Sequence, residues 1–396
     1  MSRSAGAVRA LLTLGVVFVL LATTGWTAVR QDQAPPGPRA AALLSWKHDT
    51  VAGHHLPAPD TGPDAMAAFF RSLSPHRQQR LASRHPLVVG NLDGAPVSLR
   101  YRANREALHK ARAHERTLMH SQELTQAGRR LAERRMHRFD SLLRPGRRIL
   151  AFDPTGGGRA AEVFGDLRHA DRVSVVVPGV GTDLLTFERT RHPYRAPVGK
   201  AQALQAAQHR EAPGTSTATV AWADYTAPAG LGVDAASSAM ADDGAQRLLR
   251  FVHGLPGRAP VALVCHSYGT VVCGLAAGRM PRRVTDVAAV ASPGMRAARA
   301  ADLHTHARIW AMRDRDDWIA DIPHMELGGL GLGADPVTPS FGARRLSASG
   351  ASGHEGYFVP GTDSLANLAA VAAGRLQDVR CAARDHDCAA GADGRA

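Results

Sequence analysis

The stretch from Val261 to Gly278 constrains the fold of this chain more than any other part of its sequence. It starts with the apolar run VALV, passes through the turn CHSYG with a serine at its centre, and ends in the small-residue run VVCGLAAG. A short apolar run bounded by a turn is consistent with a buried strand. A serine between a strand and a helix is typical of the G-x-S-x-G turn, which exposes the serine hydroxyl above the end of a sheet. The sequence therefore predicts a nucleophilic serine at Ser267, with Cys265 in the place of the first glycine.

Apolar strands and predicted helices alternate on both sides of this stretch. Residues 148–152 and 161–164 are predicted to pair as a hairpin around the glycines at 156–158. The other predicted strands are 173–177, 217–222, 286–291 and 307–312, and the predicted helices are 198–209, 234–253 and 364–377. Strand–helix alternation of this length predicts an α/β fold with a mostly parallel sheet in a three-layer sandwich.

The N-terminal residues have the pattern of a targeting signal. Residues 1–9 contain Arg3 and Arg9, and residues 10–29 are apolar and uncharged. Twenty helical residues extend for about 30 Å, enough to cross a bilayer. No clean cleavage site follows, so we expect residues 1–30 to be a single-pass signal anchor in the cell membrane, with the domain outside the cytoplasm. The alternative is a cleaved signal peptide and a secreted protein.

The rest of the chain divides by composition into four parts. Residues 31–59 are rich in Pro, Ala and Gly and are predicted to be a linker, and residues 60–145 form a helical N-terminal region. Within it, apolar residues at helical spacing predict one long helix from about Leu99 to Leu143. The α/β domain is expected over residues 146–378, and residues 379–396 form a polar tail.

The chain of 396 residues carries a net charge of +13, which raises the question of a polyanionic partner. Almost all the basic residues are arginines, and the lysines are Lys47, Lys110 and Lys200. No nucleic-acid-binding motif accompanies the charge, so nucleic acid is not an expected partner. The arginine-rich face of the helical region is interpreted as a solvated surface, and the alternative is electrostatic contact with anionic lipid or a cell-envelope polymer.

The four cysteines fall into two pairs. Cys265 and Cys273 lie in the serine turn and the helix after it, where free cysteines pack as small buried hydrophobic residues. Cys381 and Cys388 lie in the polar tail and are predicted to form a disulfide if the domain is exported.

The residues that would activate Ser267 are expected further along the chain. When a serine of this kind acts with an acid and a histidine, they follow in the order serine, acid, histidine. The acid is predicted in the loop after the strand 307–312, with Asp317 preferred and Asp316 as the alternative. The histidine is predicted to be His354, in the glycine-flanked segment GHEGYF; His324 is an earlier competitor.

Two backbone N–H groups are expected to stabilise a negatively charged oxygen during the reaction. One belongs to Tyr268, directly after the serine, and the other to Val180 in the glycine-rich turn PGVG. His266 is interpreted as structural, because the residue before the serine usually points away from the site. No metal and no cofactor are predicted.

These motifs resemble those of actinobacterial α/β-hydrolases whose domain is still labelled as of unknown function. The resemblance covers about residues 73–374. It rests on LSP (73–75), GNLDGAP (90–96), RANR (102–105), FDP (152–154), VPGVGT (177–182), HSYG (266–269), ASPG (291–294), DWI (317–319), LGGLG (327–331), PSFG (339–342) and GHEGYF (353–358). It implies the α/β-hydrolase fold and a triad of Ser267, Asp317 and His354.

Two functions remain open from the sequence. The first is a serine hydrolase, similar to esterases and lipases, that acts outside the cytoplasm on a small-molecule or lipid-like ester. The second is a catalytically weak or inactive scaffold that binds a cell-envelope component or a partner protein. Cys265 bears on this choice, because only a small residue fits beside the strained serine.

Overall fold

A computed structural model gives the arrangement of most of the chain. It describes residues 37–230, 235, 239–322, 324, 326–327, 330–383, 385, 388 and 390. The predicted signal anchor or signal peptide, residues 1–30, lies outside the described residues. Within the part that is described, no helix is both long and apolar enough to cross a membrane.

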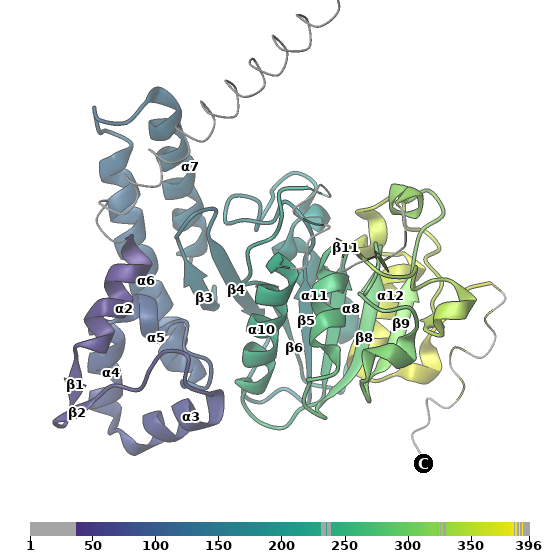
Figure 1. Ribbon diagram of the computed structural model, residues 1–396, viewed down its shortest axis with the longest axis horizontal. Helices are drawn as coiled ribbons and strands as arrows, with labels where there is room; N and C mark the ends of the chain where they lie inside the picture. Colours follow the sequence, from purple (N-terminus) through teal and green to yellow (C-terminus); the bar gives the residue numbers. More distant parts are fainter. Residues whose placement is uncertain are drawn as a thin grey trace, which may run out of the picture.

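An eight-stranded sheet forms the centre of the molecule (Figure 1). Its strands run across the sheet in the order β12-β9-β8-β7-β5-β6-β4-β3. β4 runs opposite to the other seven strands, so the carboxyl ends of those seven lie along one edge. The strands are β3 (Ile149–Asp153), β4 (Arg159–Phe164), β5 (Arg172–Val177), β6 (Thr217–Ala223), β7 (Val261–His266), β8 (Val284–Val290), β9 (Arg308–Met312) and β12 (Arg344–Arg345).

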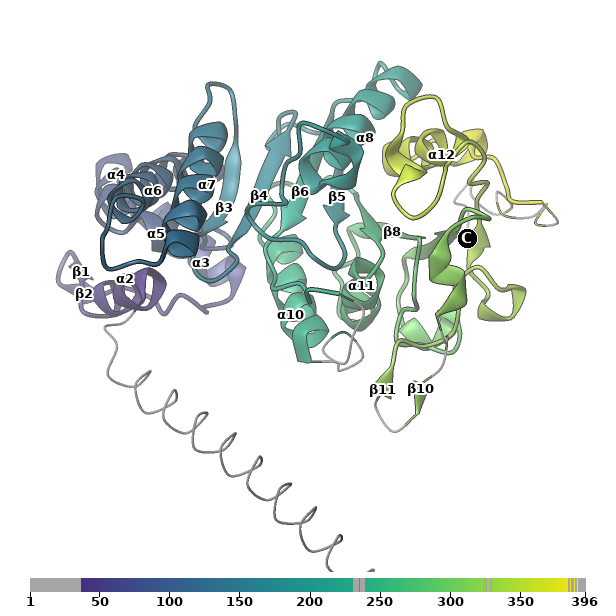
Figure 2. The same ribbon diagram turned by 90° about the horizontal axis from the view of Figure 1, so that it is seen from above.

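Helices cover both faces of the sheet. α8 (Pro197–Glu211) and α12 (Asp363–Ala373) lie on one face, and α10 (Ala239–His253) and α11 (Gly269–Ala277) lie on the other (Figure 2). Each face has its own buried core of aliphatic and aromatic side chains. The prediction of a mostly parallel sheet in three layers is therefore confirmed.

The helical N-terminal region lies beside β3 and has a third core of its own. Its helices are α2 (Pro38–Lys47), α3 (Pro63–Ser72), α4 (Pro75–Arg84), α5 (Pro86–Val89), α6 (Val97–Leu118) and α7 (Gln126–Leu142), with a short hairpin of β1 (Thr50–Val51) and β2 (His54–His55). The remaining short elements are η1 (Pro193–Arg195), η2 (Ala300–Leu303), η3 (Trp318–Asp321), β10 (Glu326–Leu327), β11 (Leu330–Gly331), η4 (Pro339–Phe341), η5 (Gly356–Phe358) and η6 (Leu376–Asp378).

The prediction of a linker over residues 31–59 is wrong from Pro38 onward. Pro38 occupies the first turn of α2, where its missing N–H costs no hydrogen bond. Trp46, near the end of that helix, is fully buried, and its indole N–H donates to the carbonyl of Pro57 over 2.7 Å. The segment is therefore part of the third core.

The single long helix predicted from about Leu99 to Leu143 is also wrong. The chain ends α6 at Leu118 and begins α7 at Gln126. Thr125 caps the second helix, because its hydroxyl oxygen accepts the N–H of Gly128 over 3.1 Å. The apolar spacing continues across the break because the two helices pack against each other, and Leu108 and Phe139 join the same buried core.

Side chains of the helical region complete the outer edge of the sheet at β3. An edge strand has unpaired backbone groups that need partners. Asn91 accepts the N–H of Phe152 over 3.0 Å and donates to its carbonyl over 2.8 Å. Arg100 and Asn104, both on α6, donate to the carbonyls of Leu150 and Ile149.

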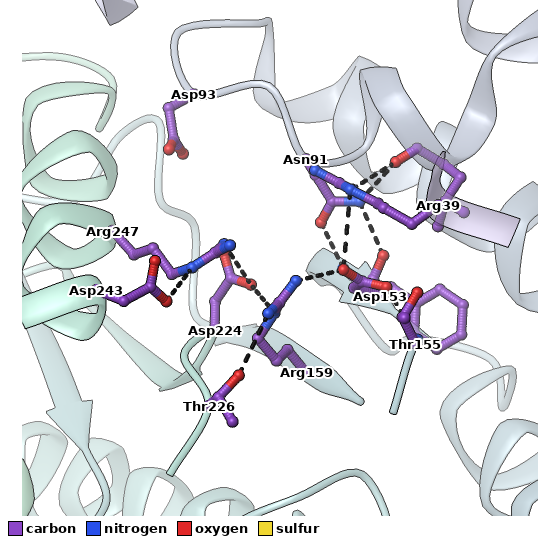
Figure 3. A network of polar contacts seen from close by, with 12 residues as sticks. Arg39, Asn91, Asp93, Asp153, Thr155, Arg159, Asp224, Thr226, Asp243 and Arg247 are labelled. Carbon is purple, nitrogen blue, oxygen red and sulfur yellow. Dashed lines mark hydrogen bonds and ion pairs between the residues drawn. The ribbon is translucent and has the colours of Figure 1, made fainter. Parts of the chain in front are cut away.

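Alternating acids and arginines join the helical region to the α/β domain at the carboxyl edge of the sheet (Figure 3). Asp153, at the end of β3, pairs with Arg39 of α2 and with Arg159 of β4. Asp224, directly after β6, pairs with Arg159 and with Arg247 of α10. Burial raises the pKa of Asp153, but Arg159 and the hydrogen bond from Thr155 outweigh burial and keep its pKa below the usual range.

Two disulfides are present, and one of them corrects the sequence analysis. Cys381 and Cys388 are bonded in the tail. Cys265 and Cys273, expected to be free thiols, are also bonded to each other, and both are fully buried. Their Cα atoms are 6.5 Å apart, because the sharp turn folds α11 back beside β7. This bond ties the end of β7 to the helix that follows Ser267.

We expect iodoacetamide to leave all four cysteines unlabelled in the urea-unfolded, unreduced protein, and to label all four after reduction. Removing the buried bond with Cys265→Ala and Cys273→Ala should lower the free energy of unfolding by about 2–4 kcal/mol. Mass spectrometry and urea unfolding measure the two effects. A double variant of Cys381 and Cys388 is the control that leaves the buried pair intact. Labelling of Cys265 or Cys273 without reductant would contradict this pairing.

Candidate active site

Ser267 lies at the carboxyl edge of the sheet, between the end of β7 and the start of α11. Its φ is 55°, in the left-handed region that residues with side chains rarely adopt. The backbone N–H of Ser267 donates to the carbonyl of Val290 on β8 over 2.9 Å, which holds the turn against the next strand. Gly269 lets the new helix pass close to β5, since a Cβ there would lie 2.4 Å from the carbonyl oxygen of Val177. This is the geometry of a strained strand-to-helix turn, which presents the serine side chain at the carboxyl edge of the sheet.

The structure brings His354 and Asp317 to this serine. His354 lies in the loop between β12 and α12, and its Nε2 is 2.9 Å from the Oγ of Ser267. Its Nδ1 is 2.8 Å from Oδ1 of Asp317, which follows β9. An ionised carboxylate only accepts hydrogen bonds, so Nδ1 donates to Asp317 and Nε2 is left to accept the serine proton.

Asp317 is held by three donors. Its Oδ1 also accepts the N–H of Ile319 over 3.0 Å, and its Oδ2 accepts the hydroxyl of Tyr357 over 2.6 Å. Burial raises the pKa of Asp317, but the hydrogen bonds from His354, Tyr357 and Ile319 outweigh it and lower the pKa below its usual value. A lowered pKa means that the carboxylate stabilises the fold above its unfolded pKa, and that this contribution is lost as the pH falls through its folded pKa.

The alternative residues lie elsewhere. Asp316 is exposed, and in the part of the chain that is described no hydrogen bond or ion pair joins it to His354. His324 is directed to the carbonyl of Pro293, with its Nδ1 3.0 Å from that oxygen. Of the candidates considered, only Asp317 and His354 therefore form a continuous hydrogen-bonded chain to Ser267. Their catalytic roles stay a prediction.

The glycine-rich turn after β5 lies directly against the serine. A Cβ added at Gly179 would come within 2.5 Å of Ser267 Cβ and 2.9 Å of its Oγ. Neither Val180 nor Tyr268 donates its backbone N–H to another residue in the described part of the chain. Tyr268 directly follows the serine, and Val180 directly follows Gly179, which lies against it, so both N–H groups are candidates for an oxyanion site.

A buried lysine, Lys200, contacts the residues next to Ser267 and His354 in the sequence. Lys200 Nζ, on α8, is 3.0 Å from Nδ1 of His266 and 2.9 Å from Oε2 of Glu355. Nε2 of His266 is in turn 2.8 Å from the backbone carbonyl oxygen of His354. The interpretation of His266 as structural agrees with this arrangement, because its ring faces α8 and not Ser267.

His266, His354 and Glu355 also come close enough together to hold a metal ion. The lysine ammonium already binds His266 and Glu355, however, and both nitrogens of His354 are engaged with Asp317 and Ser267. This donor set therefore suits an ammonium group better than a metal ion.

Exposed apolar side chains lie on the two loops that carry Asp317 and His354. The ring of Trp318 lies 4.5 Å from that of His354, centroid to centroid, and 48% of Trp318 is exposed. Val359, five residues after His354, is also exposed. A separate apolar cavity of about 740 Å³ lies between α2, α6 and α7, and its lining contains none of Ser267, Asp317 and His354.

Sequence reasoning missed Lys200, Tyr357 and Trp318. Tyr357 and Trp318 belong to the motifs GHEGYF and DWI, so their proximity to His354 and Asp317 was the available signal. Lys200 is one of three lysines in an arginine-rich chain, but nothing in its neighbourhood along the sequence connects it to His266.

Known proteins resemble parts of this chain. Residues 153–327 match the sequence profile of a family described as alpha/beta hydrolase. Two uncharacterized proteins of Mycobacterium tuberculosis, Rv2079 and MT2140, are each 26% identical over 384 residues, a match that covers 81% of this chain and 57% of theirs. The chain thus spans less than two thirds of the length of these relatives.

Two solved structures are similar to parts of this chain at low sequence identity. Esterase PE8 is 16% identical with a TM-score of 0.34, over 53% of this chain and 95% of that one. A dienelactone hydrolase from Anabaena variabilis is 17% identical with a TM-score of 0.26, over 39% and 67%. Together with the family match, the strand order establishes the α/β-hydrolase fold with an N-terminal helical region.

We expect Gly179→Ala to lower kcat/KM on an ester substrate by about 100-fold or more. The added methyl group would occupy the space beside Ser267 Oγ into which a carbonyl carbon must move. Hydrolysis of a short p-nitrophenyl ester measures the effect, and circular dichroism checks the fold. Val180→Ala is the matched control, because it keeps both the backbone N–H and the glycine. Wild-type turnover in Gly179→Ala would show that substrate does not approach from this side.

Proposed function

We propose that this α/β-hydrolase-fold protein is a serine hydrolase that cleaves esters through Ser267, His354 and Asp317. The observation that carries the proposal is the unbroken chain of contacts from Ser267 Oγ to His354 Nε2, at 2.9 Å, and from His354 Nδ1 to Asp317 Oδ1, at 2.8 Å. A serine hydroxyl is a weak nucleophile until an adjacent base can take its proton, and this geometry supplies that base.

In the proposed reaction, His354 takes the proton of Ser267 while the serine oxygen attacks the carbonyl carbon of the substrate. The oxygen of the tetrahedral intermediate accepts hydrogen bonds from the N–H groups of Tyr268 and Val180. His354 then protonates the leaving alcohol, which leaves an acyl-serine. Water, deprotonated by His354, attacks this acyl group and releases the acid. Asp317 orients the imidazole and stabilises its positive charge throughout.

Apolar surface next to the site supports an ester with an apolar portion. Trp318 is 48% exposed although its ring lies beside that of His354. Val359 is exposed on the loop that carries His354. Exposed aromatic side chains beside a reactive group supply apolar contact to a bound ligand. The proposed substrate class is therefore a small-molecule or lipid-like ester.

We also propose that the protein works outside the cytoplasm. Both cysteine pairs are bonded, and structural disulfides are typical of exported proteins. The apolar run at residues 10–29 also supports export.

A fluorophosphonate probe should label the folded wild-type protein at Ser267, because the probe reacts with serines activated by a neighbouring base. Labelling should disappear in Ser267→Ala. Ser292→Ala, which changes another buried serine near the same sheet edge, is the control and should still be labelled. The measurement is the mass of the labelled peptide. If folded wild-type protein is not labelled, the chain is better described as a binding scaffold.

Asp317→Asn should reduce kcat on a p-nitrophenyl ester by about 10⁴-fold, because an amide favours the wrong tautomer of His354. His354→Ala should reduce it by a similar factor. Asp316→Asn, at the exposed neighbouring position, should stay within about twofold of the wild type. Turnover near the wild-type rate in Asp317→Asn would contradict the assignment of the acid.

A further inference from the structure

Lys200 is a charged side chain that the proposed reaction does not use. Only 3% of its side chain is exposed, and it extends from α8 under the loop that carries His354. Burying an ammonium group is unfavourable unless its hydrogen bonds are satisfied. Among the described residues, Nζ of Lys200 makes polar contacts with His266 and Glu355, and the centre of the Phe358 ring lies 5.6 Å from it.

These contacts fix the tautomer of His266. A lysine ammonium only donates hydrogen bonds, so Nδ1 of His266 must accept. A carbonyl oxygen only accepts, so Nε2 of His266 must carry the proton that it gives to the backbone of His354. The ring of His266 is therefore neutral with its hydrogen on Nε2, and burial together with the charge of Lys200 keeps its pKa well below the usual value.

The same lysine holds two consecutive residues of the histidine loop. Lys200 contacts His266, which in turn donates to the backbone carbonyl of His354. Lys200 also pairs directly with the carboxylate of Glu355. The side chain of His354 has its own contacts to Asp317 and Ser267, and these require the backbone to stay in place. Small displacements of a catalytic group cost large factors in rate.

We propose that Lys200 is a positioning residue for His354, acting through the single tautomer that it imposes on His266 and through its ion pair with Glu355. This proposal rests on the proposed hydrolase function. Without Lys200, Nδ1 of His266 loses its donor and the ring can place its hydrogen on either nitrogen. With the hydrogen on Nδ1, the lone pair of Nε2 faces the carbonyl of His354 and repels it.

The test compares Lys200→Met with Lys110→Met, an exposed lysine of α6 that pairs with Glu106 at the surface. Lys200→Met should lower kcat on a p-nitrophenyl ester about tenfold or more and leave KM within about twofold, because the substrate contacts are unchanged. In ¹⁵N NMR spectra of the imidazole groups, wild-type His266 should remain in the Nε2–H form from about pH 5 to about pH 8. In Lys200→Met the His266 signals should show both tautomers, or protonation at higher pH. Lys110→Met should match the wild type in both measurements.

A second pair of variants keeps Lys200 and changes the residue it acts through. His266→Gln retains one acceptor for Lys200 and one donor for the carbonyl of His354, so kcat should stay within about threefold of the wild type. His266→Leu has neither an acceptor nor a donor, so its kcat should fall about tenfold or more. This pair carries the test if Lys200→Met fails to fold.

Three results would overturn the proposal: unchanged kcat in His266→Leu, unchanged kcat in Lys200→Met, or a fall in kcat for Lys200→Met with the His266 tautomer unaltered. The last result would assign Lys200 to folding alone. Failure of the hydrolase function is a separate outcome, seen as absent fluorophosphonate labelling of the wild type. In that case the NMR comparison still decides whether Lys200 fixes the tautomer, and an unaltered tautomer would overturn the proposal.

Discussion

The left-handed backbone of Ser267 is the constraint around which the rest of the domain is arranged. A residue with a side chain adopts this conformation only where its surroundings enforce it. Here β7 and α11 must leave the turn in nearly opposite directions, which brings Gly269 against β5 and Gly179 against the serine itself. The disulfide between Cys265 and Cys273 closes the same turn covalently. The small-residue run after the serine is thus explained by packing, since larger side chains would push α11 away from the sheet.

The helical N-terminal region is a structural part of the sheet rather than an appendage. Asn91, Arg100 and Asn104 give β3 the hydrogen bonds that another strand would otherwise supply. The network of acids and arginines in Figure 3 continues this contact along the carboxyl edge, towards the side on which Ser267 lies. A domain cut at residue 146 would leave β3 with exposed backbone groups and Asp153 without Arg39.

Polar groups around the histidine occur in two layers. Asp317 and Ser267 contact its ring, and Tyr357 supports the carboxylate from the far side. His266 and Lys200 contact its backbone from underneath, in the layer between β7 and α8. Such a supporting layer is what keeps a reactive group in a single orientation. The loop that carries His354 contains only the short 3-10 helix η5 between β12 and α12.

The sequence by itself determined the class of fold and the order of the candidate residues. Alternation of apolar strands with helices, the turn around Ser267, and the later positions of Asp317 and His354 are all local patterns, so they can be read without a structure. The linker at 31–59 and the long helix to Leu143 were misjudged, because composition and apolar spacing do not reveal the burial of Trp46 or the cap at Thr125. Only the tertiary structure placed Asp317 rather than Asp316 against His354, paired Cys265 with Cys273, and put Lys200 beneath the loop that carries His354. Each of these depends on which side chains from distant segments meet at one edge of the sheet, and that is set by how the strands are ordered and not by any spacing along the chain.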